Sequence, residues 1–79
     1  MWTIIVLIYN AGATKDAVVC NVRFTADGGP YDGATLVKEF VYTHPTSVDE
    51  IVTHLTEYAS MLKLSFDAPA NLDGMTWEV

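Results

Sequence analysis

The amino-acid sequence predicts a single α+β domain over residues 1–79: a small, mainly antiparallel four-stranded sheet with one amphipathic helix packed on one face. Three observations predict this β-β-β-α-β order. Residues 2–9 are apolar at almost every position, as in a strand. Two further segments alternate apolar and polar residues on either side of a glycine-rich break. Residues 47–63 then place apolar residues at the helical period.

The first segment, residues 2–9, is apolar on both of its alternating sides. These sides are Trp2, Ile4, Val6 and Ile8 on one hand and Ile5, Leu7 and Tyr9 on the other. A strand with two apolar sides is typical of an internal position in a sheet that is covered on both faces. We therefore expect this strand to lie inside the sheet.

Two predicted strands follow the first. Residues 10–14 contain Asn10 and Gly12, which favour a turn, so residues 17–26 are expected to form a hairpin with the first strand. Residues 27–33 contain three glycines and Pro30, which disfavour strand pairing and predict a loop. Residues 34–43 alternate again and give the third strand.

The helix has a well-marked start. Ser47 and Glu50 have the spacing of a capping box, in which the serine oxygen accepts a backbone N–H at the first turn. The apolar stripe consists of Val48, Ile51, Val52, Leu55, Ala59 and Leu62. We expect the helix to end within a residue or two of Lys63, and residues 64–74, with Pro69, to form a connection.

Residues 75–79 return to strand-like alternation, with Met75, Trp77 and Val79 opposite Thr76 and Glu78. We expect them to form the closing strand beside residues 2–9. The predicted order across the sheet is then closing strand, first, second and third.

The charge balance bears on the partners. Ten acidic residues against four basic ones give a net charge of −6, which argues against nucleic acid and against an anionic membrane, because both attract a cationic surface. No apolar stretch approaches the roughly 20 residues needed to span a bilayer. No Lys or Arg precedes residues 2–9, so we expect no cleaved signal peptide. With Cys20 as the one cysteine, no intramolecular disulfide is possible, and a cytoplasmic or virion location is the simpler expectation.

No motif in the sequence predicts catalysis, a metal site or a cofactor. His44 and His54 have no cysteine or carboxylate at ligand spacing, and Cys20 has no basic neighbour to stabilise a thiolate. The loop with Asp27 and Asp32 lacks the pattern of a calcium loop or a phosphate-binding loop. We therefore expect a protein that is not an enzyme.

A single helix of this length covers one sheet face, yet apolar residues occupy both. The residues expected on the side away from the helix are Ile5, Leu7, Tyr9, Val19, Val37 and Val41. Together they would form an apolar patch of several hundred Å², which is beyond what soluble monomers usually leave exposed, unless Phe66 and Leu72 cover part of it.

These observations give two hypotheses of different classes. The first is a non-enzymatic interaction or structural subunit of a viral particle or other large assembly, which binds a protein partner or itself through the apolar sheet face. The alternative is a small acidic inhibitor or regulatory protein that binds a basic surface of a larger protein.

Overall fold

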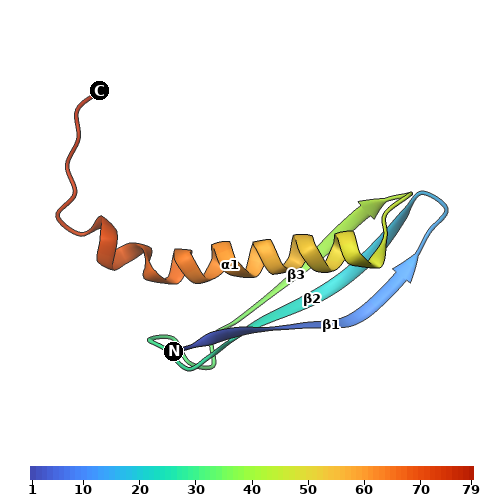
Figure 1. Cartoon of the computed structure of the whole chain (residues 1–79), viewed down its shortest axis with the longest axis horizontal. Helices are drawn as coiled ribbons and strands as arrows, with labels where there is room; N and C mark the ends of the chain where they lie inside the picture. Colours follow the sequence, from blue (N-terminus) through green and yellow to red (C-terminus); the bar gives the residue numbers. More distant parts are fainter.

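The computed structural model describes all 79 residues and contains three strands followed by one helix. The strands are β1 (Thr3–Ala13), β2 (Ala17–Asp27) and β3 (Thr35–Thr43), and the helix is α1 (Val48–Leu72). The strands form one antiparallel sheet in the order β1-β2-β3, and α1 lies along one face of it (Figure 1). The fold is therefore α+β with the order β-β-β-α.

The prediction of a four-stranded β-β-β-α-β sheet is wrong in its last element. Residues 75–79 form no strand and extend from the end of α1 away from the sheet (Figure 1). Consequently β1 is an edge strand and β2 is the internal one, the reverse of the prediction for residues 2–9. The reason is the length of α1, which ends at Leu72 instead of near Lys63 and carries the chain about 14 Å further at 1.5 Å per residue.

Aromatic contacts pack the first of the additional turns of α1 against other parts of the chain. Phe66 packs against Trp2 and Tyr31, with ring centroids 5.9 and 5.4 Å apart. Pro69 lies in the last turn, where its missing N–H removes one helical hydrogen bond, and its carbonyl still accepts the N–H of Asp73 at 3.1 Å. A proline at this position is therefore compatible with the helix.

The start of α1 is the predicted one. Ser47 is the N-cap, and its side-chain oxygen accepts the N–H of Glu50 at 3.2 Å. No stretch of α1, the only helix, combines the length and the apolar character that crossing a membrane requires.

The hairpin between β1 and β2 turns later than predicted. The pairing continues to Ala13 opposite Val18, and the register shifts between Ile8 and Asn10, so Tyr9 lies at a bulge. The bulge accommodates one extra residue in β1, which lets residues 10–13 pair rather than turn. The turn itself is held by Thr14, whose side-chain oxygen accepts the N–H of Ala17 at 3.1 Å.

The predicted loop over residues 27–33 is present between β2 and β3. Gly29 has a φ of +73°, and a Cβ placed on it would lie 2.5 Å from the Trp2 ring. Both the backbone conformation and the close approach of Trp2 therefore require a glycine at this position.

The core lies between the sheet and α1. Its buried members are Cys20, Val22 and Phe24 of β2, Phe40 of β3, and Ile51 and Leu55 of α1. Only 8 of the 79 residues are buried, and the chain measures 49 × 35 × 18 Å. The radius of gyration is 15.7 Å, against about 12 Å for a compact domain of this length. The isolated chain thus leaves much apolar surface uncovered.

Candidate protein-interaction surface

The sheet face away from α1 contains all six of the predicted interaction residues. We call this surface the open face; its side chains are Ile5, Leu7 and Tyr9 of β1, Val19, Asn21, Arg23 and Thr25 of β2, and Thr35, Val37, Glu39 and Val41 of β3. The register brings Leu7, Arg23 and Val37 into one row across the strands and sets Val19 beside Val41. The intervening residues of β2 point into the core.

The apolar side chains of the open face are largely accessible. Ile5 is 52% exposed, Val37 53% and Val41 60%. The two residues considered as possible covers lie elsewhere, because Phe66 packs against Trp2 and Tyr31, and Leu72 is itself exposed. No helix or strand of the chain covers this face.

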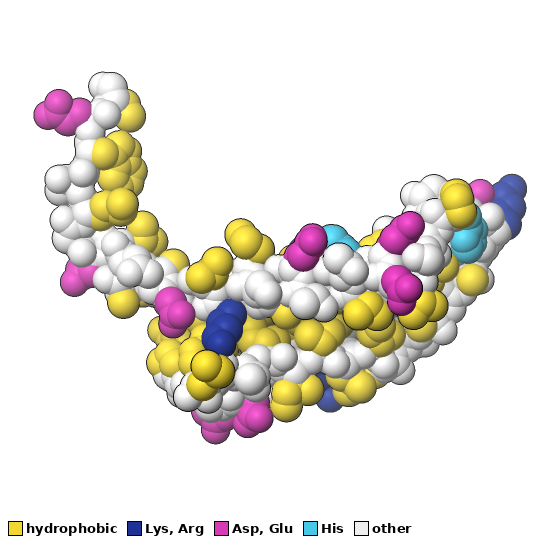
Figure 2. Space-filling model, viewed as in Figure 1, with side chains coloured by type: hydrophobic (Ala, Val, Ile, Leu, Met, Phe, Trp, Pro, Cys, Tyr) yellow, Lys and Arg dark blue, Asp and Glu magenta, His cyan; other side chains and the backbone are white.

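Charge is sparse in the middle of the open face. Arg23 and Glu39 are the charged side chains in its middle and have opposite signs, Asp27 lies at its end, and the chain as a whole carries −6. The Arg23 guanidinium lies 5.4 Å from the centre of the Tyr9 ring, a cation–π distance. By contrast, acidic side chains follow α1 on the other side of the molecule (Figure 2). The middle of the open face therefore differs from the outer surface of α1 in being apolar and nearly uncharged.

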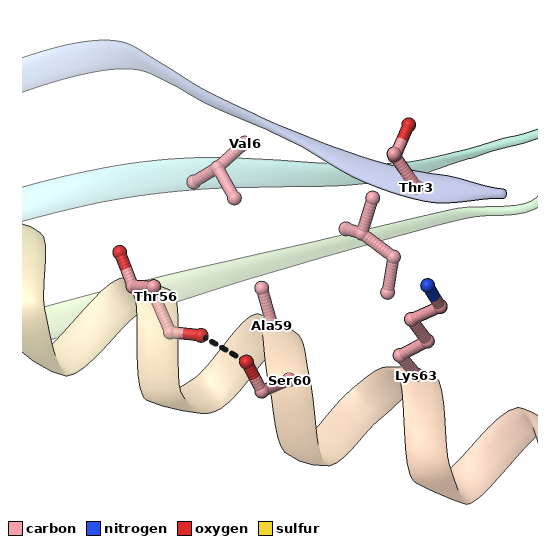
Figure 3. A pocket seen from close by; sticks show the side chains of 7 residues that line it. Thr3, Val6, Thr56, Ala59, Ser60 and Lys63 are labelled. Atoms are coloured by element: carbon pink, nitrogen blue, oxygen red, sulfur yellow. Dashed lines mark hydrogen bonds between the residues drawn. The ribbon is translucent and has the colours of Figure 1, made fainter. Parts of the chain in front are cut away.

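The structure also contains a groove of mixed apolar and polar lining that the sequence does not predict. A groove of about 330 Å³ separates β1 from α1, and Figure 3 shows side chains of the two elements facing one another across it. Its lining is Thr3, Ile4 and Val6 of β1 with Thr56, Ala59, Ser60 and Lys63 of α1. A second hollow of about 180 Å³ shares Val6 and Thr56 and continues toward Val52 and Leu55. We call the two hollows together the β1–α1 groove.

The groove exists because α1 leaves the outer edge of β1 uncovered. Val6 and Ile8 belong to the helix side of the sheet, yet they are 37% and 39% exposed. The predicted closing strand would have occupied this edge, so the sequence prediction left no room for a groove. The double apolar alternation of residues 2–9 was the available signal, and it predicted an internal strand with the closing strand at this edge.

The polar side chains singled out in the sequence have structural partners. The His54 Nδ1 atom lies 2.8 Å from the Tyr42 hydroxyl, and the His44 Nε2 atom lies 3.0 Å from the carbonyl oxygen of Thr14. Cys20 is buried in the core. Burial, and to a smaller extent the nearby Cys20 thiol, raise the pKa of Tyr42 above its ordinary value. No group of three or more His, Cys, Asp or Glu side chains is arranged to hold a metal ion.

Comparison of the chain with protein-family models, with curated proteins and with solved structures finds no match.

Proposed function

We propose that this protein is a non-enzymatic interaction subunit that binds a protein partner, or further copies of itself, through the open face within a larger assembly such as a viral particle. The observation that supports the proposal is an apolar sheet face left uncovered in a chain that buries 8 of its 79 residues. A second layer against this face would complete the two-sided cover that the sequence of β1 provides for.

The size and charge of the open face suit such a contact. An ordinary protein–protein interface buries about 800 Å² on each partner, and the face extends over three strands of nine to eleven residues. Arg23 and Glu39 carry opposite charges. In two copies related by a twofold axis, Arg23 of each copy can therefore pair with Glu39 of the other. A different protein with a similarly apolar surface also suits the open face.

The experiment adds a charge to the open face. We expect Val37→Glu and Val41→Glu to weaken self-association or partner capture while the domain stays folded, because an unpaired charge buried in an interface costs several kcal/mol, on the order of 2–5. Sedimentation equilibrium measures self-association. Affinity capture from the source cell or particle, followed by mass spectrometry, identifies a partner.

Ser65→Glu is the matched control, because it adds the same charge at an exposed position on α1 outside both the open face and the acidic hollow. We expect it to change neither association nor capture. If both valine variants associate and capture as the unmodified protein does, or if they unfold, the open face is not the contact surface.

The acidic surface of α1 supports the alternative function, an inhibitor or regulator that binds a basic surface. Asp49, Glu50 and Glu57 line one shallow hollow with Thr53 and His54. A contact of this kind weakens strongly with salt, whereas an apolar contact through the open face does not. The salt dependence of capture between about 0.05 and 0.5 M therefore separates the two functions.

A further inference from the structure

The free edge of β1 and the β1–α1 groove lie side by side and together have the form of a strand-binding site. β1 pairs only with β2, so backbone N–H and C=O groups along its other edge have no partner in the sheet. A strand added at that edge would place every second side chain toward the groove, beside Ile4, Val6 and Ile8. The regular part of β1, before the bulge at Tyr9, is the part that borders the groove.

Residues 75–79 have the sequence pattern that this site requires. Met75, Trp77 and Val79 alternate with Thr76 and Glu78, so an extended conformation gives one apolar side and one polar side. Met75 is 59% exposed and Trp77 73% exposed, and neither side chain has a place in the core. As an extended strand the segment is about 17 Å long, and α1 rises about 16 Å between Val52 and Lys63, the two ends of the groove.

The segment of the same chain cannot fill this groove while α1 is intact. Lys63 marks the end of the groove nearest the segment, where its Nζ atom lies 5.0 Å from the centre of the Trp2 ring. From there α1 continues to Leu72, about 14 Å beyond the groove. A segment of about 17 Å that folded back would follow this overhang and reach only the near end of the groove. The occupant must therefore come from another molecule.

We propose that residues 75–79 of one copy bind as an added strand along the β1 edge of a second copy, with Met75, Trp77 and Val79 in its β1–α1 groove. This contact uses a different surface from the open face and does not depend on the function proposed above. Every copy has one segment and one groove, so the contact is either reciprocal within a pair or continues from copy to copy. Trp77 is the anchor, because a large aromatic side chain contributes most to such a contact.

The test uses two full-length variants, one in which the segment is disabled and one in which the groove is blocked. Trp77→Ser disables the segment, and Thr56→Arg blocks the centre of the groove, where Thr56 lines both hollows. Both residues are exposed, so we expect unchanged circular dichroism and thermal melts. The Trp77→Ser variant also carries a fluorescent label at Lys15→Cys, in the turn between β1 and β2, and Cys20 is too buried to react.

Fluorescence anisotropy then compares two titrations of the labelled protein. Addition of unlabelled Thr56→Arg supplies an intact segment to an intact groove, whereas addition of unlabelled Trp77→Ser does not. We expect the first titration to be at least ten-fold tighter than the second. Association through the open face contributes equally to the two titrations. If the open face makes no contact, the difference between the two titrations therefore stays the same.

The control pair is Glu78→Ser and Thr53→Arg, which make matched changes on the polar side of the segment and on the outer surface of α1. When Glu78→Ser takes the place of Trp77→Ser, and Thr53→Arg takes the place of Thr56→Arg, the two titrations should give the same affinity. Equal titrations with Trp77→Ser and Thr56→Arg would overturn the proposal, including the case in which the segment binds only within its own chain or a different protein fills the groove.

Discussion

The two faces of the sheet are built from alternate residues of the same strands but differ in burial. On β2, Val22 is fully buried against α1, while the next residue, Arg23, is exposed on the open face. On β1 both faces are apolar, and Ile5 and Leu7 on the open face are more exposed than Ile4 on the other. An apolar residue in a strand therefore indicates that its face is suited to burial, without indicating whether its own chain provides the cover.

A charge placed on each face gives the largest contrast. Leu55→Glu should unfold the domain, because Leu55 is 3% exposed in the core and a carboxylate there has no partner. A domain of this size is stabilised by roughly 0.05–0.15 kcal/mol per residue, and a buried unpaired charge removes most of that. Val41→Glu on the open face should leave the thermal melt nearly unchanged. Circular dichroism of both variants checks the contrast, which fails if the two variants behave alike.

A hydroxyl group introduced on each face tests the same contrast with a smaller change in stability. Cys20→Ser should lower the free energy of unfolding by about 1–3 kcal/mol, because a buried hydroxyl lacks the hydrogen-bond partner that a thiol hardly needs. Val41→Thr is the matched change on the open face and should stay within about 0.5 kcal/mol of the unmodified protein. Urea unfolding measures both. Equal losses would show that the open face is covered.

The N-cap residue Ser47 stabilises the first turn of α1, the helix that covers one face of the sheet. Ser47→Ala should cost about 1 kcal/mol, because the N–H of Glu50 loses its side-chain acceptor. Ser65→Ala, at an exposed position within the same helix, should leave stability unchanged or slightly raised, since alanine has the higher helix propensity. A Ser47→Ala melt identical to that of the unmodified protein would contradict the role of this cap.

Local signals predicted most of the fold. The N-cap at Ser47, the breaker loop over residues 27–33 and the alternation of β2 each depend on a few neighbouring residues, and each is present where its pattern indicated, although the Glu50 side chain does not complete the capping box. The same holds for the six residues of the open face, whose side follows from the period of two along a strand. Their role in binding another protein stays a prediction.

The errors concern features that depend on distant residues. The contacts of Phe66 with Trp2 and Tyr31 pack α1 against other parts of the chain beyond Lys63, and no local pattern records them. Because α1 is longer than predicted, residues 75–79 emerge beyond the sheet and cannot pair with β1 in the same chain. The alternation of those residues predicted a strand, and that prediction is wrong, because residues 75–79 form no strand in the structure.

The smallest expected effect concerns Tyr42, at the margin of the covered face. Its hydroxyl is hydrogen-bonded to His54, so Tyr42→Phe should lower stability slightly at neutral pH. Burial raises the pKa of the Tyr42 phenol, so the folded chain holds this proton more tightly than the unfolded chain does. The stability that the neutral phenol contributes is therefore fully present below its ordinary pKa of 10.0 and is lost as the pH rises through the raised value.

The difference in free energy of unfolding between the unmodified protein and Tyr42→Phe should consequently be constant from about pH 7 to 9 and narrow above about pH 10. Tyr31→Phe is the matched control at neutral pH, because Tyr31 is an exposed tyrosine in the loop between β2 and β3, and loss of its hydroxyl should leave the free energy of unfolding nearly unchanged. Urea titrations at a series of pH values measure the three proteins. A difference that widens above pH 10 would mean that the folded state favours the phenolate, contrary to the burial of this side chain on the helix side of the sheet.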